Sequence, residues 1–113
     1  MGDTRYFSSI CGYEKQLDLG GGLNAINKEF ISRVFPDADF SGIGRPIMEN
    51  ALAVCGRCRE IMAVPVLKDM DTGKVIKKLP CPLCNGEADL AEEPVKCPQC
   101  GSPMESFPAG NWD

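Results

Sequence analysis

Residues 81–101, CPLCNGEADLAEEPVKCPQCG, contain two Cys-x-x-Cys pairs and limit the possible folds more than any other stretch. Two thiolates three positions apart can bind one cation when the backbone turns tightly between them. The prolines that follow Cys81 and Cys97 fix φ for such a turn. Beyond each pair, Asn85-Gly86 and Gly101 supply a permissive backbone. The stretch therefore predicts a metal site with thiolate ligands.

The composition points to metal ligation as a main source of stability. The chain has 113 residues, of which 7% are aromatic, with 12 Gly and 9 Pro, so an apolar core alone would be thin. It contains seven Cys and no His, which excludes His-ligated zinc, haem ligation by His and His-containing catalytic triads. With a third pair, Cys55 and Cys58, six of the seven Cys belong to Cys-x-x-Cys pairs. The kind of metal site that is not excluded is one made of thiolates alone.

The first residues, MGDTRYFSS, have neither the basic start nor the apolar run of a signal peptide. No apolar stretch approaches the roughly 18 residues of a membrane span. We therefore expect a cytoplasmic protein that makes no membrane contact. In that reducing compartment the Cys pairs are metal ligands and not disulfides, and their spacing also disfavours an extracellular disulfide scaffold.

Periodicity predicts one helix among short strands. Residues 4–19 alternate like a strand, and residues 23–35 carry Leu23, Ile26, Phe30 and Val34 on one helical face. Pro36 ends this helix, and residues 37–50 form a loop with an apolar character. Further strands are expected in five segments, residues 51–54, 60–67, 74–79, 87–91 and 103–107. Trp112 is expected to pack back on the fold or to contact a partner.

Cys11 is the seventh Cys, and its neighbours suggest a ligand. Cys11-Gly12 repeats the Cys100-Gly101 ending of a knuckle, and Ser8 stands where a paired Cys would be. We interpret Ser8 to Cys11 as a degraded fourth half-site. The alternative is a buried free Cys with no ligand role.

The stretch from Cys55 to Gly101 resembles zinc ribbon proteins, specifically the CPxCG-type knuckles of double zinc ribbons and rubredoxin-like metal-binding folds. Residues 7–19, FSSICGYEKQLDL, are similar to the opening knuckle of small multi-knuckle ribbon proteins of bacteria and archaea, with Ser8 in place of a Cys. The resemblance implies structural zinc with four thiolate ligands. It also implies a small metal-stabilised α+β fold of knuckles, short β-hairpins and one α-helix. Residues 1–58 would hold the first knuckle, the helix and a strand, and residues 59–113 the C-terminal zinc ribbon packed with them as one unit.

Carried over by position, the resemblance gives one complete site and one incomplete site, and two pairings are open. The favoured pairing makes a complete site of Cys81, Cys84, Cys97 and Cys100 and leaves Cys11, Cys55 and Cys58 as the incomplete one. Its short loop closes at the lower entropic cost. The competing pairing joins Cys55 and Cys58 with Cys81 and Cys84 across a hairpin of ordinary ribbon length. The incomplete site would bind its metal weakly, use another donor or stay empty.

We expect a structural zinc-binding module that serves as a protein-interaction or accessory protein and has no catalytic activity of its own. The Cys55 pair lacks the βαβ context of a thioredoxin-type redox motif, and a four-thiolate zinc site leaves no position for water. One alternative is electron transfer through a rubredoxin-like four-thiolate iron centre. Another is nucleic-acid binding, which the net charge of −4 disfavours. Its candidate residues are Arg57, Arg59, Lys74, Lys77 and Lys78.

Overall fold

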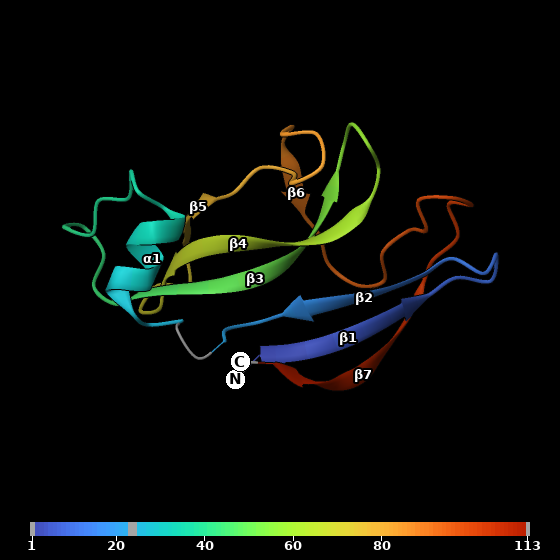
Figure 1. The fold of residues 1–113 in the computed structure, drawn as a ribbon, viewed down its shortest axis with the longest axis horizontal. Helices are drawn as coiled ribbons and strands as arrows, with labels where there is room; N and C mark the ends of the chain where they lie inside the picture. Colours follow the sequence, from blue (N-terminus) through green and yellow to red (C-terminus); the bar gives the residue numbers. More distant parts are fainter. Residues whose placement is uncertain (1, 23–24, 113) are drawn as a thin grey trace.

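Two antiparallel β-sheets and one helix make up the part of the chain that the computed structural model describes, residues 2–22 and 25–112 (Figure 1). The β-rich architecture with a single helix and cysteine knuckles agrees with the coarse features of the predicted fold class. In chain order the elements are β1 (Gly2–Ser8), β2 (Glu14–Leu19), α1 (Lys28–Val34), β3 (Pro46–Cys55), β4 (Ile61–Asp69), β5 (Val75–Lys78), β6 (Ala88–Leu90) and β7 (Glu105–Trp112).

The first sheet has the strand order β2-β1-β7, so the central strand β1 pairs with strands from both ends of the sequence. The predicted strand over residues 4–19 is a hairpin, because a tight turn at residues 9–13 separates β1 from β2. The expected alternation holds in β2, where Leu17 is buried between exposed neighbours. Trp112 packs back as predicted, since its indole Nε1 donates a hydrogen bond to the Leu19 carbonyl at 2.8 Å.

The second sheet has the order β5-β4-β3-β6 and is built on the long β3–β4 hairpin, which pairs from Pro46 with Asp69 to Val54 with Ile61. Strand β3 is longer than the predicted residues 51–54 and takes up part of the predicted loop 37–50. The reason is tertiary: the Met48 N–H donates to the Ala25 carbonyl at 2.8 Å, which fixes the early part of β3 beside the segment before the helix.

Helix α1 is shorter than predicted, and of its predicted apolar face Val34 packs against the buried cluster around Ile31. It begins at Lys28 because the Asn27 side chain caps it by accepting a hydrogen bond from the Phe30 N–H. Ile31 is fully buried and packs with Phe35 and with Leu67 of β4. The prediction that Ile26 belongs to the buried face is wrong, because this side chain is 68% exposed. Leu23, the first residue of the predicted face, lies outside the described residues.

A cluster of buried side chains holds the two sheets against each other. Phe7 and Leu17 of the first sheet pack with Leu52 and Ile61 of the second, and Val95, Cys97 and Met104 complete the cluster. The division of the chain at residue 58 stays a prediction about folding units. Both parts share this cluster, and β3 pairs with β4 across the division. The turns that carry the cysteines lie at the ends of the sheets, away from α1 (Figure 1).

Candidate metal centre

Four thiols meet at one end of the second sheet. Cys55 ends β3 and Cys58 lies in the turn to β4, while Cys81 and Cys84 lie in the turn between β5 and β6. All four sulfurs lie within 4.8 Å of one another. The Cys55 and Cys84 sulfurs are 3.4 Å apart, and those of Cys58 and Cys81 are 3.7 Å apart. We call these four residues the first cluster.

The spacing of the first cluster fits a tetrahedral metal ion. With metal–sulfur bonds of about 2.3 Å, the edge of a regular tetrahedron of sulfurs is about 3.8 Å. The measured separations of 3.4 and 3.7 Å are close to that edge. Two of the sulfurs, those of Cys55 and Cys81, belong to buried residues, so a bound ion would be largely shielded from solvent. The donor set is that of a closed structural site.

Three further thiols, those of Cys11, Cys97 and Cys100, form a second cluster at the end of the first sheet. The sulfurs of Cys11 and Cys97 are 3.6 Å apart, again close to the edge of a tetrahedron. Cys97 is buried, whereas Cys11 and Cys100 are exposed. Cys11 therefore lies among ligand candidates, as expected of a half-site, and it is exposed where the alternative expected a buried Cys. Its ligand role stays a prediction.

The favoured pairing of half-sites, Cys81 and Cys84 with Cys97 and Cys100, is wrong, and the competing pairing is the observed one. The favoured pairing closes the 12-residue connection between Cys84 and Cys97, and the competing pairing closes the 22-residue connection between Cys58 and Cys81. The shorter connection costs only about 0.5 kcal/mol less in loop-closure entropy. Strand pairing outweighs this term. Strand β6 pairs with β3 so that Ala88 lies opposite Cys55, which brings Cys84 to the first cluster. Strand β7 pairs with β1 and brings the turn at residues 97–101 to Cys11.

The three Cys-x-x-Cys turns share one backbone conformation. In each of them the N–H of the first Cys donates to the carbonyl five residues later, and the residue after the second Cys donates back to the first Cys. That following residue has a positive φ, 61° at Arg59, 59° at Asn85 and 76° at Gly101. The turns also direct amides at sulfur, since the N–H of Cys58 lies 3.4 Å from the Cys55 sulfur. These turns therefore have one tight conformation that could hold a metal ion between paired thiols.

Hydrogen bonds tune the acidity of the thiols in both clusters. The backbone N–H of Cys58 is the main cause that lowers the pKa of Cys55 from 9.0 to about 6. In the second cluster, the hydrogen bond from the Ser9 hydroxyl is the main cause that lowers the pKa of Cys100 to about 6. At Cys84 the N–H of Gly86 acts in the same direction, but contact with the neighbouring Cys55 raises the pKa to about 11. In each cluster hydrogen bonds thus favour the thiolate form of one Cys, which is the form that binds a cation.

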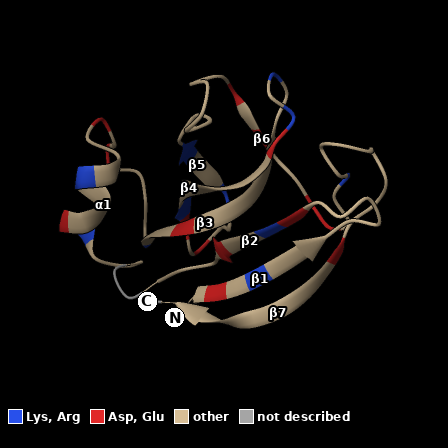
Figure 2. Cartoon of the chain, turned by 45° about the vertical axis from the view of Figure 1, so that its right-hand side comes forward, with Lys and Arg blue, Asp and Glu red and all other residues tan. Residues whose placement is uncertain are grey.

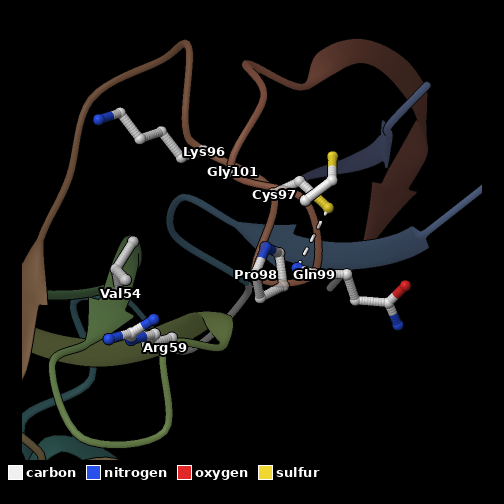
Figure 3. Close-up of a pocket in the computed structure, with 8 residues that line it drawn as sticks. Val54, Arg59, Lys96, Cys97, Pro98, Gln99 and Gly101 are labelled. Atoms are coloured by element: carbon white, nitrogen blue, oxygen red, sulfur yellow. Dashed lines mark hydrogen bonds between the residues drawn. The ribbon is translucent and has the colours of Figure 1, made fainter. Parts of the chain in front are cut away.

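A surface groove of about 460 Å³ borders the second cluster (Figure 3). One wall is the knuckle at residues 97–101, in which the Gln99 N–H donates to the Cys97 sulfur at 3.4 Å. The other wall includes Val54 and Arg59 from the β3–β4 hairpin, and Lys96 lines the groove as well. The second cluster is therefore more accessible to solvent and to small molecules than the buried thiols of the first.

The basic residues predicted for nucleic-acid binding fall into two groups. Arg57 and Arg59 are exposed on the first-cluster turn, whereas Lys77 pairs with Leu67 of β4. Leu67 lies six positions along β4 from Ile61, which is next to that turn, and this corresponds to about 20 Å. Figure 2 shows acidic positions interspersed with basic ones along the ribbon. The Lys78 Nζ lies 3.7 Å from Glu87 Oε1. Lys74 begins the return to β5, and a nucleic-acid role for these residues stays a prediction.

Sequence reasoning missed Ser9. The notion of a degraded half-site pointed to Ser8, three positions before Cys11, but the hydroxyl beside the thiols is that of Ser9. Its oxygen is 3.2 Å from the Cys100 sulfur and 3.4 Å from the Cys11 sulfur. Aligning Cys11-Gly12 with Cys100-Gly101 selects Ser8, and the shorter turn is seen only in its backbone hydrogen bonds.

No helix among the described residues is both long and apolar enough to cross a lipid bilayer. The two cysteine clusters could hold metal ions and are consistent with a zinc-binding fold. Comparison of the chain with models of protein families, with curated proteins and with solved structures finds no match.

Proposed function

We propose that this chain is a structural zinc-binding module of the zinc ribbon type, and that it acts as a protein-interaction or accessory protein without catalytic activity of its own. The observation that carries the proposal is the first cluster, in which four sulfurs from two knuckles lie within 4.8 Å of one another. Four thiolates at tetrahedral spacing are a common ligand set for structural zinc. Such a site leaves no position on the metal for substrate or water.

The first cluster joins the β3–β4 hairpin to β6 and the turn before it, which contribute Cys81 and Ala88 to the buried apolar cluster of the hairpin. Strand β6 has three residues, of which Asp89 and Leu90 are exposed, and within the described part of the chain it pairs with the end of β3 alone. Because Cys84 and Cys55 flank this pairing, a shared ion would fix β6 and the turn before it to the hairpin. Apparent binding free energies of structural zinc sites are roughly 10–16 kcal/mol, comparable with the whole stability of a small domain.

Exposed apolar side chains on the knuckles support a role in binding a protein partner. Ile10 is 89% exposed in the turn of the second cluster, and Leu83 is 69% exposed in the turn of the first. A metal-held knuckle presents such a side chain on a rigid backbone, which lowers the entropic cost of docking. The predicted apolar loop is a weaker candidate, because Phe40 and Ile43 pack against the cluster around Ile31.

A rubredoxin-like iron centre is the second candidate, and the geometry of the first cluster favours it as much as zinc. Four thiolates in a tetrahedron bind iron as well as zinc. Electron transfer would require an iron centre near the surface, and Cys58 of the first cluster is exposed. A purified protein that is red and bleaches with dithionite would establish this function and remove the zinc proposal.

The test is elemental analysis of protein purified without chelator, combined with a count of reactive thiols. We expect zinc in the preparation, with the Cys55 and Cys81 thiols protected from alkylation until a chelator is added. A folded, metal-free protein with all seven thiols reactive would contradict the proposal. The partner role is tested with Leu83→Asp and Ile10→Asp, which should keep their metal and lose binding to the physiological partner, with Ser32→Ala on the exposed face of α1 as the control.

A further inference from the structure

The turn between β1 and β2 is a fourth knuckle, shortened by one residue. The Ser9 N–H donates to the Tyr13 carbonyl at 2.9 Å, and the Gly12 N–H donates back to the Ser9 carbonyl at 3.0 Å. In the other three knuckles the first Cys makes these two bonds, each with a residue one position further along. Gly12 follows Cys11 with φ of 93°, as a positive-φ residue follows the second Cys elsewhere. Ser9 therefore occupies the backbone position of a first ligand.

The Ser9 hydroxyl also occupies a ligand's place in space. Its oxygen is 3.2 Å from the Cys100 sulfur and 3.4 Å from the Cys11 sulfur. For metal–sulfur bonds of about 2.3 Å and a metal–oxygen bond of about 2.0 Å, the sulfur–oxygen edge of a tetrahedron is about 3.5 Å. Together with the 3.6 Å between the Cys11 and Cys97 sulfurs, these separations match three edges of a tetrahedron with three sulfur corners and one oxygen corner.

We propose that Ser9 Oγ is the fourth ligand of a second metal ion, which Cys11, Cys97 and Cys100 bind through their sulfurs. The proposal rests on the proposed function, since both require that the clustered thiolates bind a divalent cation such as zinc. The β1–β2 turn and the knuckle at residues 97–101 supply two ligands each, as the two knuckles of the first cluster do.

The two sites differ in how tightly they hold their ions. An alcohol oxygen is a weaker ligand than a thiolate for a soft or borderline ion such as zinc. The second cluster has one buried Cys and two exposed ones, and it borders the surface groove. The first cluster has two buried Cys and four thiolates. The second ion therefore exchanges faster with chelators than the first.

The test uses the full chain loaded with Co²⁺, whose absorption reports the number of thiolate ligands and their geometry. Three variants are compared with the unmodified protein: Ser9→Ala, Ser9→Cys and, as the matched control, Ser8→Ala. Ser8 is the last residue of β1 and lies opposite Glu14 and Glu105 in the sheet. Each protein is titrated with Co²⁺ and then with imidazole, a small ligand that binds any open position on the metal.

We expect the unmodified protein and Ser8→Ala to bind two Co²⁺ ions through seven thiolates, with spectra that imidazole does not alter. Ser9→Cys should raise the thiolate charge-transfer absorption by about one part in seven, because an eighth thiolate is added. Ser9→Ala should release the second ion at least tenfold faster and bind imidazole. Faster release alone does not prove ligation, since losing a hydrogen bond to a metal ligand also costs about 10–100-fold in affinity. The imidazole response makes that distinction.

Two results would overturn the proposal. One is an imidazole response in the unmodified protein as large as in Ser9→Ala, which would mean that water holds the fourth position. The other is a Ser9→Cys spectrum without added thiolate absorption, which would place residue 9 away from the metal. In both cases the four-thiolate spectrum of the first cluster persists, and the proposed function stands. Absence of any Co²⁺ spectrum would instead refute the proposed function together with this inference.

Discussion

The stability of this protein should depend on the free zinc concentration with a slope that counts its metal sites. An ion that binds only the native state adds about 1.4 kcal/mol to the free energy of unfolding for each tenfold rise in its concentration above the dissociation constant. Two clusters, each releasing one ion on unfolding, therefore give about 2.7 kcal/mol per tenfold change. The double variant Cys11→Ala/Cys100→Ala removes two exposed ligands of the second cluster and should lower the slope to about 1.4 kcal/mol.

The assay is urea unfolding in metal-buffered solutions, followed by the fluorescence of Trp112, which is held in β7 by its bond to the Leu19 carbonyl. With an m-value of about 1–3 kcal/mol/M, each tenfold change in free zinc moves the midpoint by about 1–3 M. Ser32→Ala, on the exposed face of α1, serves as the control and should keep the full slope. A slope near zero would refute metal binding, and equal slopes in the double variant and the unmodified protein would refute a second site.

Three further outcomes follow from the structure. The pKa of Cys100 is lowered from 9.0 to about 6, so the contribution of this thiol to stability is complete above pH 9 and is lost as the pH falls toward 6. The urea midpoint should therefore be lower at pH 6 than at pH 8. Equal midpoints at the two pH values would contradict this prediction. Gly101→Ala should cost about 1–2 kcal/mol in thermal unfolding, since φ is 76° there, whereas Gly42→Ala, which has open space around its Cα, should cost much less. Ile31→Ala should lower the free energy of unfolding by about 2–5 kcal/mol, because it leaves a cavity at a fully buried site beside Leu67. The dependence of stability on free zinc should stay unchanged. A changed dependence would show that the helix and the metal sites are coupled.

Local patterns in the sequence predicted the existence of the knuckles, the helix and a strand at β2, although not all of their bounds. The Cys-x-x-Cys spacing with Pro and Gly neighbours predicts knuckles, and three of them are present with one shared hydrogen-bond pattern. Alternation predicts the strand around Leu17, and a 3.6-residue period predicts one helix. In each case the residues that determine the structure are close together in the sequence, so no knowledge of the rest of the fold is needed.

The pairing of the knuckles could not be predicted, because distant strands determine it. The decisive contacts are Ala88 with Cys55 and Glu105 with Ser8, which no local pattern encodes. Burial of Ile31 in place of Ile26 also depends on a distant residue, Leu67 of β4. The participation of Ser9 was hidden because its turn has lost one residue, so the regular spacing of three positions pointed to its neighbour.

If both clusters bind metal, their different sequence separations set the order in which they can be loaded while the chain is being made. In the first cluster the contact between Cys55 and Cys84 spans 29 residues, whereas in the second the contact between Cys11 and Cys97 spans 86. All four thiols of the first cluster have been translated before Cys97 is added. A chain still attached to the ribosome can therefore bind an ion at the first cluster and fold the long hairpin around it. At that stage Cys97 and Cys100, which complete the second cluster with Cys11, have not yet been added.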